Sequence, residues 1–288
     1  WGEAEARQVL RQALGCDMPM QILSMQTWTA GHALVAQSLS SGRVFLIGDA
    51  AHLFTPTGGL GYNTGVEDAV NLGWKLAAAL RGQAGPALLE SYALERKPLA
   101  QRNTGYARHF ADSVGLFPAT PMLEEDTAEG RDLRHQASLH FNAHVRLEFN
   151  IPGVTFGGRY DGSPVVFDDG TRAPPDQANV YVPSAKPGGR PPHAWLADGR
   201  SLFDTFGRDW TLLVLQPQEM SWGKWQADAT ERGLDLTVVE LDQPDLLGLY
   251  GAPWVLIRPD QIVAWRGDAS ASPAEIWPLL LGYPLRSV

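Results

Sequence analysis

The chain has 288 residues, 44% of them hydrophobic and 19% charged, and its 32 acidic against 23 basic residues leave a formal net charge of −9. This composition is typical of a folded globular protein, and the acidic balance excludes nucleic acid as the main partner because binding to phosphates needs a basic stripe. The single cysteine excludes an internal disulfide, and no apolar run reaches the roughly 18 residues of a membrane span, so we expect a cytoplasmic protein with no membrane partner.

The first predicted elements are a helix and several strands. Apolar residues at helical spacing predict a helix over residues 3–14, and Gly15 stands where a helix would stop. Residues 20–40 alternate in the manner of strands. The short apolar run 44–47 is typical of a strand that is buried on both faces.

A loop rich in glycine and proline follows, and then a helix. Residues 55–61 (TPTGGLG) predict the loop. We expect the helix to begin near Thr64, because Thr64 and Glu67 have the spacing of a capping box. Its apolar residues recur on one face, the pattern of an amphipathic helix: Val66, Val70, Trp74, Ala77 and Leu80.

The rest of the chain divides into helices, a connector and an α/β region. Helices are predicted over 86–110, where Pro98 would end or kink the helix, and over 122–148. Residues 151–192 are dense in Gly, Pro and Asp and predict a connector with short strands. From 193 on, strand, helix and strand are followed by a hairpin and a helix, which predicts a compact α/β domain. Its predicted strands cover 212–215, 234–240, 254–257 and 262–265, and its predicted helices cover 222–232, 244–250 and 273–281.

The residues that carry chemistry lie between 43 and 76. The predicted buried strand presents Asp49 at its carboxyl end, where the ligands of open α/β sheets sit. The Gly-rich loop lets the backbone approach a ligand, and the helix start offers unpaired N–H groups and a positive dipole. A carboxylate for hydroxyl groups and amides for a carbonyl-rich ring together suit a flavin. The spacing by itself would also suit a sugar or a phosphate, although an Asp beside a phosphate is unfavourable.

Here the chain resembles the class A flavoprotein aromatic hydroxylases, in their phenol-hydroxylase-like and polyketide-hydroxylase-like members. The resemblance is strong over roughly residues 20–100 and weak elsewhere, and it rests on the second flavin motif of that family. The matching residues are Gly48-Asp49-Ala50-Ala51-His52, Pro56, Gly59-Leu60-Gly61-Tyr62-Asn63 and 68–76 (DAVNLGWKL), followed by Tyr92, Glu95, Arg96 and Pro98 of the next helix and by the connector segment 158–166. A motif of this length is far more specific than a glycine triplet.

The resemblance implies a fold and a domain plan. It predicts an α/β chain in which residues 1–150 form the C-terminal part of a Rossmann-like FAD-binding domain of the p-hydroxybenzoate hydroxylase type. Residues 151–192 would be the connector. Residues 193–288 are similar to the thioredoxin-like domain of phenol-hydroxylase-type members, without a CxxC pair, so disulfide exchange is excluded.

The resemblance also implies an activity. Such enzymes are FAD-dependent monooxygenases that hydroxylate phenolic or polycyclic aromatic substrates with NAD(P)H and O2, through a flavin C4a-hydroperoxide. The cofactor carries the difficult chemistry, so we name no catalytic acid or base, and we assign no metal. A homodimer is a possible assembly.

Individual positions receive roles from the same resemblance. Asp49, following Gly48, would bind the FAD ribityl chain. The amides of the helix start would lie against the isoalloxazine, and Pro56 would flank its reactive face. The full set expected to bind the cofactor is Gly48, Asp49, Pro56, Gly59, Gly61, Tyr62 and Asn63. Trp28 and His32 precede the flavin strand and would line the substrate pocket.

Several residues of the same region have a plain structural interpretation. We expect His52 to be a packed, hydrogen-bonded histidine, Asp68 to pair locally and Trp74 to belong to the core. His140 and His144 are four apart without a helper pattern such as HExxH, so a solvated helix face is expected rather than a metal site.

The chain departs from the family in one important respect. The G-x-G-x-x-G segment that binds the FAD pyrophosphate is absent from this sequence. An alternative hypothesis is therefore a non-catalytic truncated remnant, or a subunit whose partner supplies that half of the flavin site. A further alternative is a related flavin enzyme that carries out epoxidation or another oxidation.

Overall fold

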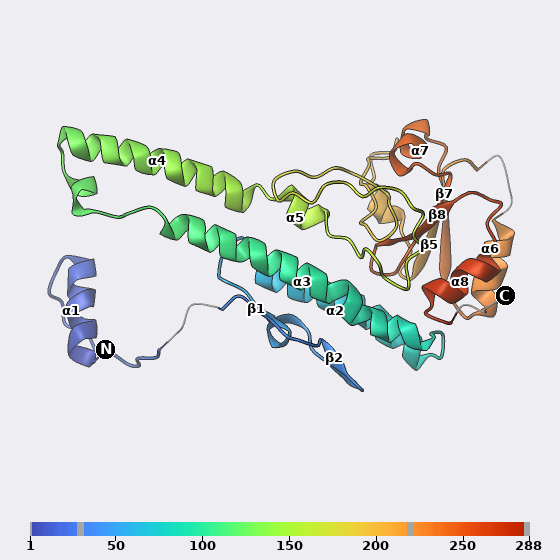
Figure 1. Ribbon diagram of the computed structural model, residues 1–288, viewed down its shortest axis with the longest axis horizontal. Helices are drawn as coiled ribbons and strands as arrows, with labels where there is room; N and C mark the ends of the chain where they lie inside the picture. Colours follow the sequence, from blue (N-terminus) through green and yellow to red (C-terminus); the bar gives the residue numbers. More distant parts are fainter. Residues whose placement is uncertain (1, 28–31, 218–221, 285–288) are drawn as a thin grey trace. The chain divides into compact units, whose positions relative to one another are not determined.

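The computed structural model describes residues 2–27, 32–217 and 222–284 (Figure 1). The chain divides into two units, Trp1–Gly31 and His32–Val288. The first unit contains helix α1 (Glu3–Leu14), which ends at Gly15 with φ 67°, so the predicted helix is confirmed. The strand pattern expected over residues 20–40 is confirmed only at 34–35 and 40–41. It is wrong over 20–27, which form no regular secondary structure, since no neighbouring strand pairs with them. The predicted domain limits at 150 and 192 stay a prediction.

The second unit begins with two short antiparallel pairs. Strand β1 (Leu34–Val35) pairs with β4 (His52–Leu53), and β2 (Ser40–Ser41) pairs with β3 (Val44–Phe45). A 3-10 turn, η1 (Gly48–Ala50), connects β3 to β4. The strand expected to be buried on both faces is wrong for this chain: the described residues leave Val44 63% exposed, because β3 pairs with β2 alone.

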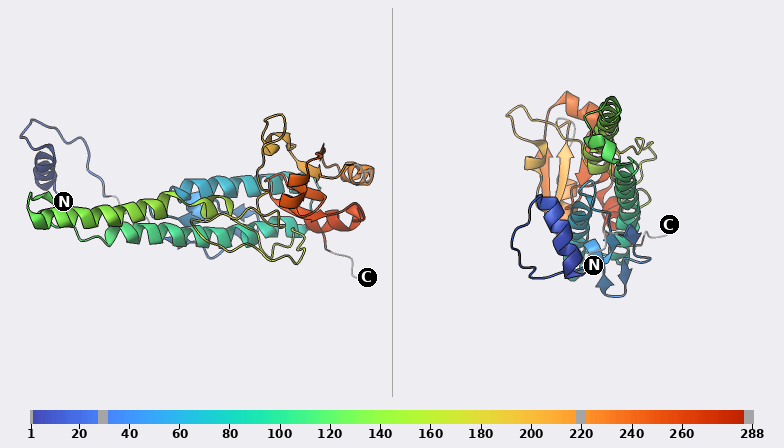
Figure 2. Two further views of the ribbon diagram at one scale, coloured as in Figure 1. Left: turned by 90° about the horizontal axis from the view of Figure 1, so that it is seen from above. Right: turned by 90° about the vertical axis from the view of Figure 1, so that its left-hand side faces the viewer.

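Helices α2 (Leu60–Leu80) and α3 (Pro86–Gly115) lie side by side, and the views in Figures 1 and 2 both show this arrangement. Helix α2 begins four residues before the expected start, because Gly59 takes φ 63° and turns the chain into the helix. Thr64 is therefore not a cap. It is buried inside the helix, and its hydroxyl oxygen accepts a hydrogen bond from Asn103 at 3.1 Å.

The buried face of α2 is largely polar, whereas an amphipathic helix buries its apolar face. Its buried residues include four polar ones, and the full set is Leu60, Thr64, Asp68, Asn71, Leu72, Lys75 and Ala78. Val66, Val70 and Leu80 are exposed, Leu80 by 88%. The apolar face predicted from the sequence is thus wrong, because buried ion pairs hold the polar face inward.

Helix α3 confirms the helix predicted over 86–110. It continues through Pro98, so the helix does not end at this proline, and the alternative of a kink there stays a prediction. Helix α4 (Ala128–Phe149) packs against α3 after a 3-10 turn, η2 (Pro121–Glu124), which confirms the predicted third helix. The connector holds α5 (Pro152–Phe156) and isolated bridges in place of strands. None of the helices in the described ranges is long and apolar enough to cross a membrane.

The C-terminal region is the α/β domain that the sequence predicts. After η3 (Leu202–Thr205) come the elements β5 (Trp210–Val214), α6 (Gly223–Glu231), β6 (Leu236–Glu240), α7 (Pro244–Tyr250), β7 (Trp254–Ile257), β8 (Val263–Gly267) and α8 (Pro273–Leu280). The sheet order is β6-β5-β7-β8, with β5 and β6 parallel and the other pairs antiparallel. Alternate residues of each strand point to opposite faces, so each face carries its own core.

The core of this domain extends to the helix pair. One face of the sheet packs tryptophans of β5, α6, β7, β8 and α8, and Trp74 of α2 joins them with its ring 5.8 Å from that of Trp210. Trp74 is therefore a core residue, as expected. Gly85 donates to Leu281 at 2.8 Å, and any Cβ at Gly85 would lie 2.2 Å from the carbonyl oxygen of Gly282. The start of α3 and the end of α8 can approach this closely because both glycines lack a side chain.

Candidate cofactor site

The turn that carries Asp49 rests directly on helix α2. Gly48 takes φ 54°, and a Cβ built on Gly65 would lie 3.2 Å from the Gly48 Cα. Gly65 is five residues past Leu60, about 7.5 Å along a helix that rises 1.5 Å per residue. The structure therefore brings Asp49 and the start of α2 into one neighbourhood.

The start of α2 presents free backbone donors. The first turn of a helix has no intrahelical acceptor for its N–H groups, and no partner is recorded for those of Leu60, Gly61 and Tyr62 within the described ranges. The Asn63 side chain donates to the carbonyl of Gly59 at 2.7 Å and so stiffens the entry to the helix. Tyr62 is 82% exposed and leaves the amides uncovered.

The donor set fits the chemistry expected of it. Asp49 is exposed, and no described side chain or amide pairs with its carboxylate. Pro56 and Gly59 are exposed on the same loop. A free carboxylate for hydroxyl groups next to free amides for carbonyl oxygens is what a flavin with its ribityl chain would need, so the residues present fit the group.

Asp68 holds the Asp49 turn in place from inside the protein. Its carboxylate accepts the Gly48 amide at 3.1 Å, His52 at 2.6 Å and the Arg96 guanidinium at 2.8 Å. Burial raises the pKa of Asp68, but the His52 hydrogen bond and the charge of Arg96 outweigh it and hold this pKa below its usual value. The expectations that Asp68 pairs locally and that His52 is a packed histidine are confirmed.

Helix α4 holds the Gly-rich loop from the other side. One oxygen of Glu148 accepts the Gly58 amide at 2.7 Å, and the other lies 2.6 Å from His144 Nε2. His144 is buried, so the expected solvated histidine face is wrong at this position. Sequence reasoning missed Glu148. Its spacing of four from His144 on a helix was the available signal.

A second buried cluster joins α2 and α3 to the C-terminal domain. Glu95 binds Arg258 through two hydrogen bonds at 2.7 and 2.9 Å and Lys75 at 2.5 Å. Arg258 also binds Asp260 at 2.6 Å, and Asn71 donates to both acids. Two cations and two anions balance, and their side chains are at most 2% exposed. We call Lys75, Glu95, Arg258 and Asp260 the buried ion cluster.

The electrostatics of the buried ion cluster follow from its burial. Burial raises the pKa of Glu95, yet the charges of Arg258 and Lys75 overcome this and lower it. Burial lowers the pKa of Lys75 to about 8 against the opposing charge of Glu95. The family motif pointed to Glu95 and Lys75 in the sequence, whereas nothing there pointed to Arg258 or Asp260, which come from the turn after β7.

The two residues expected to line a substrate pocket are not tested by this geometry. Trp28 lies outside the described residues. His32 is exposed two residues before β1, and its role stays a prediction. Within the described ranges, no group of three or more His, Cys, Asp or Glu side chains is placed to hold a metal ion.

Comparison with known families identifies two regions of the chain. A model described as "FAD binding domain" matches residues 2–107, and one described as "Aromatic-ring hydroxylase, C-terminal" matches residues 184–279. The chain is 33% identical to the FAD-dependent monooxygenase opdD of Penicillium oxalicum, over 93% of this chain and 54% of that protein. It is also 33% identical to phenol 2-monooxygenase of a Pseudomonas species, over 94% of this chain and 50% of that protein.

Solved structures of flavin enzymes also resemble this chain. The rebeccamycin biosynthetic enzyme RebC with reduced flavin matches with a TM-score of 0.82 at 36% identity, covering 96% of this chain and 52% of that one. Aklavinone-11 hydroxylase with FAD and aklavinone matches with a TM-score of 0.71 at 28% identity, covering 98% and 51%. The predicted fold is confirmed, and the chain spans about half the length of the relatives it matches.

Proposed function

Because the chain belongs to the FAD-dependent aromatic-ring hydroxylases, of whose members it spans about half, we propose that it works as part of an FAD-dependent monooxygenase. The enzyme uses NAD(P)H and O2 to hydroxylate a phenolic or polycyclic aromatic substrate. The observation that carries the proposal is that the free Asp49 carboxylate and the free amides at the start of α2 lie in the same neighbourhood.

Each part of the chain has a task in this proposal. Bound FAD supplies the redox chemistry and the activation of O2. Asp49 accepts hydrogen bonds from the ribityl hydroxyl groups, and the amides of Gly61, Tyr62 and Asn63 meet the carbonyl edge of the ring. Pro56 would flank the reactive face of the bound ring, and Trp28 and His32 would contact the substrate.

The setting of the enzyme is part of the same proposal. It is a cytoplasmic protein that acts on a small aromatic molecule, and two copies form a homodimer. The acidic composition and the single cysteine support an intracellular setting. Sedimentation of the purified chain tests the dimer, and a single species of monomer mass contradicts it.

FAD binding tests the proposed role of Asp49. We expect the 288-residue chain to quench flavin fluorescence on titration with FAD, and Asp49→Ala to weaken the affinity about 10- to 100-fold, since a hydrogen bond to a charged group contributes about 1.5–3 kcal/mol. The matched control is Asp132→Ala on an exposed face of α4, which should bind FAD like the parent chain. Equal affinity of the Asp49 and Asp132 variants removes the proposed role.

A second candidate follows from exposed apolar side chains on β1, β3 and β4, including Leu34, Val44 and Leu53. In it, the chain is a subunit that needs a partner polypeptide to complete the FAD site. FAD binding that appears after addition of a separately expressed dinucleotide-binding half of a relative favours this candidate. Binding by the chain alone favours the first.

A further inference from the structure

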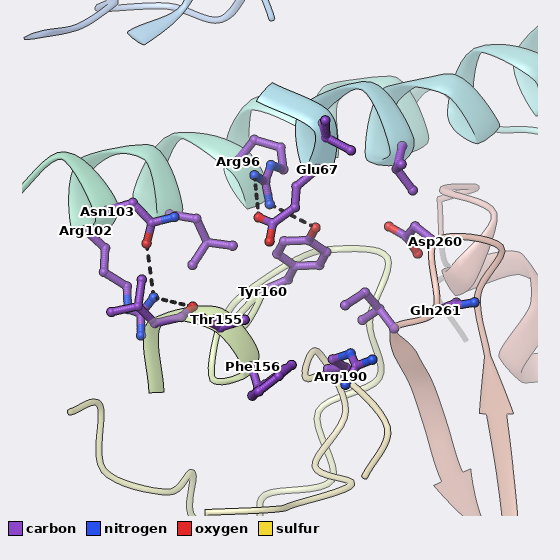
Figure 3. Close-up of a pocket in the computed structure, with 16 residues that line it drawn as sticks. Glu67, Arg96, Arg102, Asn103, Thr155, Phe156, Tyr160, Arg190, Asp260 and Gln261 are labelled. Atoms are coloured by element: carbon purple, nitrogen blue, oxygen red, sulfur yellow. Dashed lines mark hydrogen bonds and ion pairs between the residues drawn. The ribbon is translucent and has the colours of Figure 1, made fainter. Parts of the chain in front are cut away.

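A cavity lies on the side of α2 and α3 that faces the connector. Figure 3 shows it between these helices, α5 and the turn after β7, and its volume is about 210 Å³. Its apolar walls come from Val66, Val70, Leu99, Val154, Phe156 and Ile262. None of the described residues assigned to FAD or to the substrate lines it.

Most of the charged groups at this cavity are already paired. Arg96 binds Asp68 at 2.8 Å and Glu67 at 2.9 Å. Arg102 binds Asp176 at 2.6 Å, and Asp260 is bound by Arg258 at 2.6 Å. These pairs leave little net charge to attract a ligand.

Arg190 is different, because no carboxylate is recorded within ion-pair distance of it in the described part of the chain. The guanidinium carbon lies 4.3 Å from the centre of the Phe203 ring and 5.2 Å from that of Phe156. Figure 3 shows the group at the edge of the cavity, between Phe156 and the turn that carries Gln261. Aromatic rings pack against the guanidinium, and no described acceptor takes its N–H groups.

This arrangement suits a planar anion. A guanidinium fork binds a carboxylate through two parallel hydrogen bonds, and rings that hold the group reduce the rotamer entropy lost on binding. The cavity is smaller than the roughly 300–1,000 Å³ of most drug-sized ligand sites, so it suits one ring rather than a polycyclic molecule. Phe156 and Tyr160 add aromatic surface for that ring.

We propose that this cavity binds a single-ring aromatic carboxylate, with the carboxylate on Arg190 and the ring against Phe156, Tyr160 and the apolar wall of α2. The site goes beyond the proposed monooxygenase function and does not depend on FAD. It also gives the C-terminal half of the chain a ligand, since the connector supplies Arg190 and the turn after β7 supplies Ile262.

Calorimetric titration of the 288-residue chain with sodium benzoate tests the proposal, with benzamide as the neutral compound of the same shape. We expect saturable binding of benzoate. The affinity for benzamide should be weaker by about tenfold or more. Arg190→Gln should weaken benzoate binding by about tenfold or more, and Arg190→Lys should restore only part of it because a lysine has no fork. The control is Arg172→Gln, an exposed connector arginine outside the cavity, which should bind like the parent.

A second variant guards against a folding defect at Arg190. Val70 is half exposed on α2 and also lines the cavity, so Val70→Trp adds bulk to the cavity while Arg190 is kept, and it should abolish benzoate binding while circular dichroism stays unchanged. Equal affinity for benzoate and benzamide overturns the proposal, and so does benzoate binding that survives both Arg190→Gln and Val70→Trp. Inorganic phosphate that displaces benzoate with similar affinity overturns the aromatic part of it.

Discussion

One continuous stretch of sequence, residues 48–76, builds two regions with opposite surroundings. The turn at Gly48-Asp49 and the start of α2 lie at the surface with free hydrogen-bonding groups. In the body of α2, Asp68 and Lys75 are buried in ion pairs with α3, and Asn71 donates a hydrogen bond to Asp260 after β7. A polar residue in the first region is available to a ligand, and a polar residue in the second already has its partner in the protein.

The polar residues of one long motif serve different ends in the two regions. All of these residues match the same flavin motif, yet Asp68, Asn71 and Lys75 make their hydrogen bonds within the fold. Asp68 links the two regions, because it also accepts the Gly48 amide. One helix thus carries, side by side, residues proposed to bind a ligand and residues whose hydrogen bonds hold the fold together.

Removing the centre of the buried ion cluster should have the largest effect. Glu95→Ala leaves Lys75 and Arg258 buried with Asp260 as their remaining anion, and breaking a buried pair costs about 3–5 kcal/mol. We expect the free energy of unfolding in urea to fall by that amount. Glu90→Ala, on the exposed face of the same helix, should change it by less than about 0.5 kcal/mol. Similar losses in both variants would mean that the cluster does not stabilise the domain contact.

The link between the two regions should show an intermediate effect. Asp68→Asn removes the charge that faces Arg96 and places an amide near the Gly48 N–H, so we expect about 1–3 kcal/mol of lost stability together with weaker FAD binding. Glu67→Gln changes the half-exposed partner of Arg96 and should cost less than about 1 kcal/mol. Stability that falls while FAD affinity stays constant would separate the two regions.

Lowering the pH should have the smallest of the three effects on the free energy of unfolding, and it should act through the buried region. Glu95 and Asp68 have lowered pKa values, so their stabilisation is present above the ordinary values of 4.5 and 3.8 and is lost as the pH falls toward the folded values. Linkage then predicts a loss of about 1 kcal/mol from these two groups between pH 7 and pH 4. Urea midpoints at the two pH values measure it. Glu95→Gln should reduce the difference, and an unchanged difference would contradict the assignment.

The C-terminal domain was predictable almost element by element. Its strands are short apolar runs bounded by turns, and each run packs mostly against partners within the same region, so local pattern and burial agree. The Asp49 turn and the Gly-rich loop were recognisable for a different reason, since a motif of many residues is specific even where local structure is uncertain.

The helix α2 was the clearest failure of local pattern. Val66, Val70 and Leu80 have the spacing of a core face, yet they are exposed, while Asp68 and Lys75 are fully buried. A prediction from hydrophobic pattern treats every buried charge as unfavourable. Here the cost of burying Asp68 and Lys75 is offset by their partners Arg96 and Glu95 on another helix. Whether burial of such a charge stabilises or destabilises the fold therefore depends on which distant residues the tertiary structure places beside it.

The sequence by itself determined the class of cofactor chemistry, the α/β character and the order of the C-terminal elements, because these depend on short-range spacing and on a long local motif. Tertiary structure alone decided which half of the motif faces solvent, that Arg258 and Asp260 complete an ion cluster with Lys75 and Glu95, and that Arg190 is left without an anion. Those outcomes depend on Coulomb interactions and desolvation between groups far apart in the chain, such as Glu95 and Arg258, which are 163 positions apart, and no local pattern records them.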